Sequence, residues 1–193
     1  MDIFAHTLWA NAVARGANKI AEKKSRRSTG SGPDASGFHI NVGWTAFWGV
    51  FPDLFAFSIP FFIGLYKIIS GKSFLSLFRD HHNTIGGFDL SSYFYQFSHS
   101  LIIFLLVFIL VWILSGRPRY ELLGWVFHIL IDIPSHNISF FPTPFLFPIS
   151  EYRFPYGVHW SNQWYMLVNY IALLVVWGGI IWKKYSKKNL ELQ

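Results

Sequence analysis

The chain has 193 residues, of which 52% are hydrophobic, 20% aromatic and 13% charged, too little polar surface to cover a soluble domain. Its formal net charge is +6, but the basic residues flank apolar stretches, which favours contact with membrane lipids and argues against nucleic acid as a partner. The absence of cysteine excludes disulfides, thiol nucleophiles and cysteine-ligated zinc. Composition therefore predicts a single membrane-embedded domain over residues 1–193.

The first predicted element is a helix over residues 3–21, which is apolar through Ala14 and then basic. It lies on the membrane, enters the bundle or crosses the bilayer, and the sequence does not separate these alternatives. Residues 22–43 combine charge with Ser, Gly and Pro, a composition that cannot bury a core. They are predicted as a flexible loop.

Four hydrophobic segments follow, each long enough as a helix to cross ~30 Å of hydrocarbon at ~1.5 Å per residue. They are Trp44–Tyr66, Phe97–Ser115, Glu121–Phe141 and Trp164–Trp182. Backbone inside a bilayer must satisfy its own hydrogen bonds, so the spans must be helical. The predicted fold class is all-α: a polytopic transmembrane bundle of four spans, or five if the N-terminal helix also crosses.

The connecting segments are polar and turn-rich, and they also indicate the orientation of the chain. Residues 71–93 and 142–163 are predicted as surface segments. Residues 15–29 hold six Lys and Arg, 116–120 two and the tail after Trp182 four, against four on the other side. By the positive-inside rule, the three segments with the larger total, 15–29, 116–120 and the tail, lie in the cytosol. We expect a multi-pass protein of a bacterial or archaeal cytoplasmic membrane, with residues 183–193 as a cytoplasmic tail.

Ionisable residues inside the spans are the first candidates for chemistry, because an Asp at a helix centre costs ~2.5 to 3.5 kcal/mol and is rarely kept without a use. Asp53 follows Pro52, which frees a backbone carbonyl and marks a kink beside a cavity. His99 opens the second span between two serines. In the third span His128, Asp132 and His136 are spaced four apart, so all three can face the bundle interior.

Taken singly, each of these side chains is explained as well by a structural hydrogen bond between helices. Together, imidazoles and carboxylates from several spans favour a divalent metal site, because they offset one another's burial cost around a cation. His6 is a further candidate ligand, with a buried polar contact as the alternative. His159, His81 and His82 fall in polar loops, where solvation explains them as well as metal does.

At these motifs the chain resembles the membrane-bound metal-dependent hydrolases also labelled LexA-binding, inner membrane-associated hydrolases. Four features carry the resemblance, in the same order from His6 to Ser150. They are an N-terminal His (His6), a Pro-Asp pair (Pro52-Asp53), a Thr-His-Ser motif that here is Ser98-His99-Ser100, and a Gly-x-x-x-His-x-x-x-Asp helix (Gly124–Asp132) before a Pro-containing loop.

The resemblance implies that Asp53, His99, His128 and Asp132 hold a divalent ion, with zinc expected first and manganese or iron as alternatives. Either His136 or an unligated carboxylate would be the general base, and the serines beside His99 would orient that imidazole. His136 and the ligand Asp53 are the candidate catalytic residues. The reaction implied is attack of an activated water on a phosphoester or an acyl ester, of which a lipid or lipid-linked molecule is one candidate.

Other classes fit the sequence less closely. A transport or ion-handling protein is the main alternative, in which the same residues form a pathway; their concentration in one half of the bilayer favours an enzyme. A di-iron lipid oxidase needs repeated histidine boxes that are missing. A phospho-histidine lipid phosphatase needs motifs that this chain has only in fragments. A scaffold with a purely structural polar core is the remaining alternative.

Overall fold

The computed structural model describes residues 1–29, 38–71 and 85–191 of the chain. Within these ranges it contains seven α-helices, one short 3-10 helix and no strand, which confirms the predicted all-α class. The elements are α1 (Ile3–Thr29), α2 (Val42–Ala56), α3 (Ser58–Ile69), α5 (Ile85–Ser98), α6 (Leu101–Ser115), η3 (Tyr120–Leu122), α7 (Leu123–Ser135) and α8 (Gln163–Glu191).

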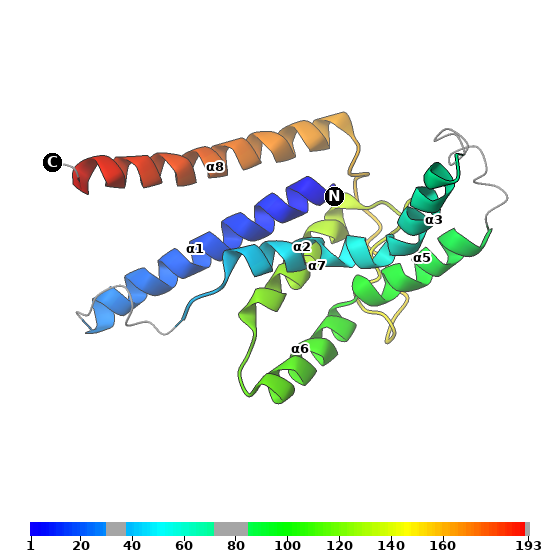
Figure 1. Cartoon of the computed structure of the whole chain (residues 1–193), viewed down its shortest axis with the longest axis horizontal. Coiled ribbons are helices and arrows are strands. Elements are labelled where there is room, and N and C mark those ends of the chain that lie inside the picture. Colours follow the sequence, from blue (N-terminus) through cyan, green and yellow to red (C-terminus); the bar gives the residue numbers. More distant parts are fainter. Residues whose placement is uncertain (30–37, 72–84, 192–193) are drawn as a thin grey trace.

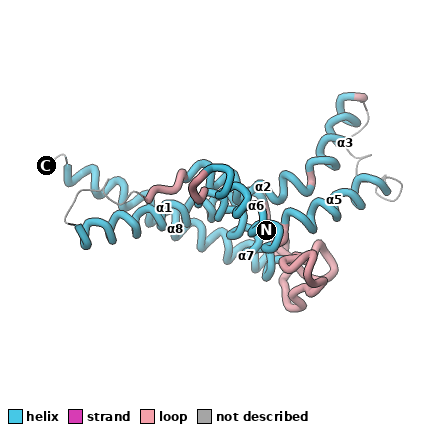
Figure 2. Tube along the Cα trace, turned by 90° about the horizontal axis from the view of Figure 1, so that it is seen from below, coloured by secondary structure: helices cyan, strands magenta, loops and turns pink. Residues whose placement is uncertain are grey.

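Helices α2 and α7 lie at the centre of the molecule. Helix α1 packs against α2, and α8 runs alongside α1 on the outer side (Figure 1). Helices α3 and α5 pair at the opposite end, and α6 packs on α7. The loop that joins α7 to α8 is folded close to the end of α7 (Figure 2). Helices α1 and α7 both pack on α2, and these three helices carry the predicted site residues His6, Asp53, His128 and Asp132.

Helix α8 is long and apolar enough to cross a membrane. Its stretch Gln163–Ser186 has 24 residues and a mean hydropathy of 1.8, and at ~1.5 Å per residue it exceeds the ~30 Å of a hydrocarbon core. This stretch contains the predicted span Trp164–Trp182. Among the described helices it is the one that meets this test without a break.

Two further predicted spans include a sharp bend or begin at one. The predicted span Trp44–Tyr66 is α2 with Ser58–Tyr66 of α3, bent by 65°. The predicted span Phe97–Ser115 is mainly α6, which forms a pair bent by 63° with Leu90–Ser98 of α5. Pro60 lacks the N–H that would bond the Ala56 carbonyl, which explains why α2 stops there. Ser100 is extended and caps α6 by accepting from two backbone amides. The described helices thus supply one span, or up to three if each bent pair is counted.

The predicted span Glu121–Phe141 is shorter in the structure than the sequence suggested. Helix α7 has 13 residues, about 20 Å at ~1.5 Å per residue, and ends at Ser135. Pro134 lies in its last turn, and His136 after it is extended. The amide of Val158 donates to the Pro134 carbonyl at 2.8 Å, so the α7–α8 loop takes over where the helix stops.

Helical structure also extends into three segments that the sequence assigned to loops or tails. Helix α1 continues to Thr29, inside the predicted loop 22–43, where Glu22 and Arg26 pair at 2.6 Å one turn apart. Glu, Lys and Arg are strong helix formers, and such pairs add support.

Helix α5 begins at Ile85, within predicted surface segment 71–93, and α8 continues through the predicted tail to Glu191. Residues 30–37, 72–84 and 192–193, and so His81 and His82, lie outside the described residues.

The central helices approach one another through glycines. A Cβ on Gly124 of α7 would overlap the backbone carbonyl of Thr45 in α2, and one on Gly49 of α2 would overlap the Ala10 side chain in α1. Small residues at such contacts let helix backbones come close, which is the usual way that helices pack within a membrane. This close approach brings α1, α2 and α7 within reach of one set of side chains.

Candidate metal centre

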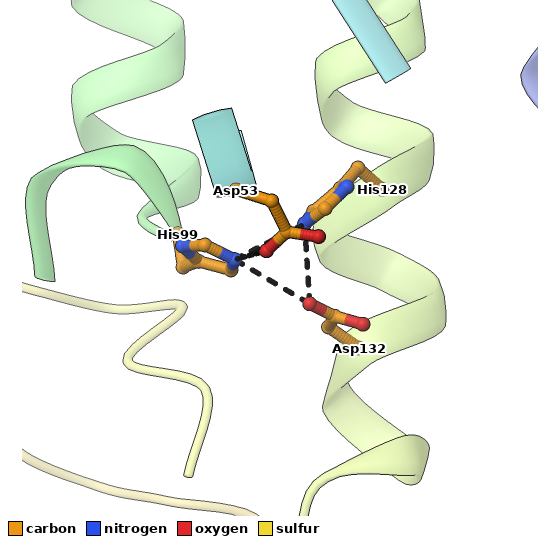
Figure 3. Close-up of side chains that lie close together, drawn as sticks. All are labelled: Asp53, His99, His128 and Asp132. Carbon is orange, nitrogen blue, oxygen red and sulfur yellow. Dashed lines mark hydrogen bonds and ion pairs between the residues drawn. The ribbon is translucent and has the colours of Figure 1, made fainter. Parts of the chain in front are cut away.

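Four predicted ligands come together in the centre of the molecule. Asp53 comes from α2, His99 from the break between α5 and α6, and His128 with Asp132 from successive turns of α7 (Figure 3). One nitrogen or oxygen of each lies within 4.8 Å of all the others. His99, His128 and Asp132 are at most 1% exposed and Asp53 is 8% exposed. The structure therefore contains a buried His/Asp group that could hold a metal ion.

The separations between these atoms match those of metal ligands. His128 Nε2 lies 3.0 Å from His99 Nε2 and 3.1 Å from Asp132 Oδ2. His99 Nε2 lies 3.4 Å from Asp132 Oδ2 and 3.5 Å from Asp53 Oδ1, which in turn is 3.7 Å from His128 Nε2. Ligands bound tetrahedrally at ~2.0 to 2.1 Å lie about 3.3 Å apart, a value inside the 3.0 to 3.7 Å range of these five separations.

Hydrogen bonds on the far side of each imidazole fix its tautomer. His128 Nδ1 lies 2.8 Å from the carbonyl oxygen of Gly49, which can only accept, so Nδ1 carries the proton. His99 Nδ1 lies 3.2 Å from the Tyr95 carbonyl and 2.9 Å from Ser98 Oγ, and donates on that side. In the neutral rings both Nε2 atoms are unprotonated, and they point at each other and at two carboxylates. Such a group of acceptors requires a proton or a cation among them.

Asp132 connects this group to the N-terminal helix. Its Oδ2 faces the two imidazoles and accepts no hydrogen bond of good geometry. Its Oδ1 accepts from the Met1 amino group at 2.6 Å and from Ser135 Oγ at 3.2 Å. The carboxylate is thus held on one side and has a free acceptor on the side where an ion would sit.

His6 and His136 both contact Asp132 from outside the group of four. His6 Nε2 lies 3.0 Å from Asp132 Oδ1, and its ring stacks on His128 with centroids 3.7 Å apart. His136 Nδ1 lies 3.5 Å from the same Oδ1 and 3.2 Å from the Asp132 backbone carbonyl. The structure places both at the edge of the site, one on α1 and one just after α7.

The sequence analysis missed Tyr95, which supports His99. Its ring stacks on the imidazole with centroids 3.7 Å apart, and its hydroxyl donates to the Phe141 carbonyl at 2.8 Å. Tyr95 precedes His99 by four residues, one helical turn, and that spacing was the available signal.

His159 lies apart from the group, bonded to Ser161.

The two serines beside His99 have different roles. Ser98 Oγ contacts the His99 imidazole. The backbone carbonyl of Ser98 accepts a hydrogen bond from the Trp125 indole N–H at 2.5 Å. Ser100 instead caps α6 and donates to the Phe147 carbonyl in the α7–α8 loop. The backbone of His99 is therefore held on both sides by neighbours from α6, α7 and the loop.

A cavity of about 690 Å³ lies beside the metal group. Asp53 and His136 line it at the site, and the rest of its wall is mainly apolar. The other lining residues are Met1, Asp2, Ile3, Phe4, Leu54, Phe57, Ser58, Phe61, Phe62, Phe140, Phe141 and Trp160. The volume lies in the ~300 to 1,000 Å³ range of small-molecule sites.

No family model, curated protein sequence or solved structure matches this chain. What the fold and the site define together is an all-helical protein with at least one helix able to cross a membrane and a buried His/Asp group suited to a metal ion.

Proposed function

We propose that the protein is a multi-pass membrane hydrolase that uses a divalent metal ion held by Asp53, His99, His128 and Asp132 to cleave an ester. The observation that carries the proposal is the set of four acceptor atoms from three parts of the chain, all within 4.8 Å of one another and buried. The family resemblance of the motif residues points the same way, and the bacterial or archaeal cytoplasmic membrane remains the proposed location.

The outer helices support a location within the bilayer. Ile113 and Leu114 of α6 are 72% and 77% exposed, and Leu174 and Val175 of α8 are 72% and 70% exposed. Contiguous apolar surface of this kind is rare on proteins in water and ordinary on proteins in lipid. We propose that α8 and the two bent pairs cross the membrane while α1 and α7 pack inside them.

The donor set fits a borderline or hard dication. Two imidazoles and two carboxylates suit zinc, manganese or iron, and the absence of cysteine disfavours softer metals. Asp132 already pairs with the Met1 amino group, and a 2+ charge would further offset the cost of burying both carboxylates. We propose zinc first, with manganese and iron as the alternatives.

When bound, such an ion supplies a Lewis acid that makes a water molecule acidic enough to act as a nucleophile near neutral pH. The chain supplies the proton acceptor. His136 lines the cavity beside Asp53, and its Nδ1 donates to the Asp132 carbonyl, which leaves Nε2 unprotonated. We propose His136 as the general base and Asp53 as a ligand whose second oxygen can share this role.

A transport pathway is less well supported. In the described part of the chain every buried histidine and aspartate belongs to the four-residue group or contacts it. A path for ions needs polar groups at several depths of the bilayer. One compact cluster beside a mainly apolar cavity favours chemistry at a single point.

Elemental analysis of the detergent-purified full chain tests the metal site. We expect about one ion per chain in the wild type, retention in His159→Gln, and loss in His128→Gln combined with Asp132→Asn. Ester hydrolysis should disappear on chelation and return when zinc, manganese or iron is restored. A wild type that binds none of these metals after supplementation would instead favour the transport or structural alternative.

A further inference from the structure

The cavity beside the metal group shares two polar residues with the site, and most of the rest of its wall is apolar. Asp53 and His136 belong both to its wall and to the site. Apart from Asp2 and Ser58, the other lining residues are apolar side chains from the N-terminal segment with α1, from α2 and α3, and from the α7–α8 loop. A ligand that fills it must therefore carry a reactive polar group at one end and an apolar body at the other.

We propose that this cavity holds the acyl chain of an uncharged carboxylic ester lipid, with the ester group at Asp53 and His136. This inference names the substrate class of the hydrolase proposed above and rests on it. Water would add to the acyl carbon, the bond from that carbon to the alkoxy oxygen would break, and the products would be a carboxylic acid and an alcohol that takes up a proton.

Access to the cavity is from the side that we assign to the bilayer. Phe4 is 75% exposed, and Phe61 and Phe62 on α3 are 66% and 63% exposed, although all three line the cavity. Helix α3 is half of a bent pair that is apolar enough to span a membrane. An acyl chain could enter between these rings without leaving hydrocarbon for water.

The charges along the cavity select against a phosphoester. Among the described residues no Lys or Arg lines it, whereas Asp2 and Asp53 do. The Met1 amino group is already paired with Asp132 at 2.6 Å. With a dication bound, its charge and that of the Met1 amino group would together be offset by the three carboxylates of Asp2, Asp53 and Asp132, so a phosphate would add buried negative charge with no partner. An uncharged ester avoids that cost.

Arg153, a cation that could have served a phosphate, lines a separate cavity with Tyr95 and Gln96. Phe140 and Phe141 border both cavities and lie between them. The basic side chain therefore lines the neighbouring cavity and not the one that contains Asp53 and His136.

The first experiment maps binding without chemistry. An ether-linked alkyl lipid with a diazirine in its chain cannot be hydrolysed, and would be photolysed with the purified full chain. We expect adducts on residues 54–62 and 3–4. Ser58→Trp, which fills the cavity, should reduce this labelling at least tenfold, while Leu65→Trp on the same helix but outside the cavity should leave it within twofold. Labelling confined to α6 and α8, or unchanged in Ser58→Trp, would overturn the proposal.

The second experiment measures hydrolysis of p-nitrophenyl esters from acetyl to palmitoyl, beside bis(p-nitrophenyl) phosphate. We expect long acyl esters to react at least tenfold faster than the phosphodiester, and Ser58→Trp to slow long-chain but not acetyl ester hydrolysis. Phe62→Ala, which enlarges the cavity, should favour longer chains. A preference for the phosphodiester would overturn the substrate class. Labelling in the cavity without hydrolysis in the presence of zinc, manganese or iron would refute the proposed hydrolase activity but would still support an acyl-chain binding site.

Discussion

Helices α2 and α7 meet through glycine and enclose imidazoles and carboxylates, whereas α6 and α8 present isoleucine, leucine and valine outward. In the centre, backbone contacts decide which side chains fit, and a polar group is kept because several others surround it. On the outer helices the surrounding solvent decides, and any apolar side chain of similar size serves. The buried imidazoles and carboxylates thus lie where the helix backbones pack most closely, and the exposed apolar side chains lie on the outer helices.

The largest expected difference between the two regions is in how much the free energy of unfolding falls when a large side chain is truncated to alanine. Ile129 of α7 is fully buried beside Trp125 and Phe104, while Ile113 of α6 is 72% exposed. Ile129→Ala should lower the free energy of unfolding by about 2 to 5 kcal/mol because it leaves a cavity. Ile113→Ala should change it by about 0.5 kcal/mol or less. Thermal unfolding in one detergent measures both, and equal losses would contradict the division.

A methyl group added at a glycine should have opposite effects on stability in the centre and on the outer helices. Gly124→Ala should force α7 away from the Thr45 carbonyl of α2 and cost about 1 to 3 kcal/mol or more. Gly178 in α8 has nothing within 4 Å of the position a Cβ would take. Gly178→Ala should therefore be neutral or stabilising by up to about 1 kcal/mol, since alanine is the better helix former.

Both glycine variants would be unfolded in the same detergent, and Gly124→Ala would also be assayed for metal content. A Gly124→Ala protein as stable as the wild type would mean that α2 and α7 can separate at no cost. The close packing would then not be what holds the ligands together.

Replacement of His6 separates a ligand from a supporting residue. His6→Phe keeps a ring to stack on His128 but removes the contact of Nε2 with Asp132. If His6 only orients Asp132, metal affinity should fall about 10- to 100-fold, as is typical for residues that hold a ligand in place. Competition with a metal-sensitive dye measures this, and the exposed His39→Phe is the control. A loss as complete as in the His128→Gln and Asp132→Asn protein would make His6 a direct ligand.

Sequence reasoning predicted the composition of the site better than the course of the chain. The cost of a carboxylate in a span pointed to Asp53 and Asp132, and the four-residue spacing put His128 on the same face as Asp132. These relations are local, or depend on a large burial energy, and both can be inferred from one sequence. The structure brings those residues together with His99.

What the sequence analysis did not predict depends on contacts between distant segments. Hydropathy sums residues over a window, so it does not register the break before Pro60 that divides the predicted span Trp44–Tyr66, or the cap at Ser100 where α6 begins. The length of α7 depends on the distant Val158, whose amide takes up the Pro134 carbonyl. The stacking of His6 on His128 likewise follows from the glycine contacts among α1, α2 and α7, which no local pattern contains.

The smallest expected effect lies where the two regions join, at Ser100. Its side chain accepts from the amides of Ile102 and Ile103 and donates to the Phe147 carbonyl, so it fixes the start of α6 next to His99. Ser100→Ala removes the cap and should lower the free energy of unfolding by about 1 kcal/mol. Ser115→Ala, at the exposed end of the same helix, should cost about 0.5 kcal/mol or less. Because Ser100 does not contact the imidazole itself, metal affinity should change less in Ser100→Ala than in His6→Phe. A larger change would show that the backbone position of His99, rather than the hydrogen bonds of its ring, determines metal affinity.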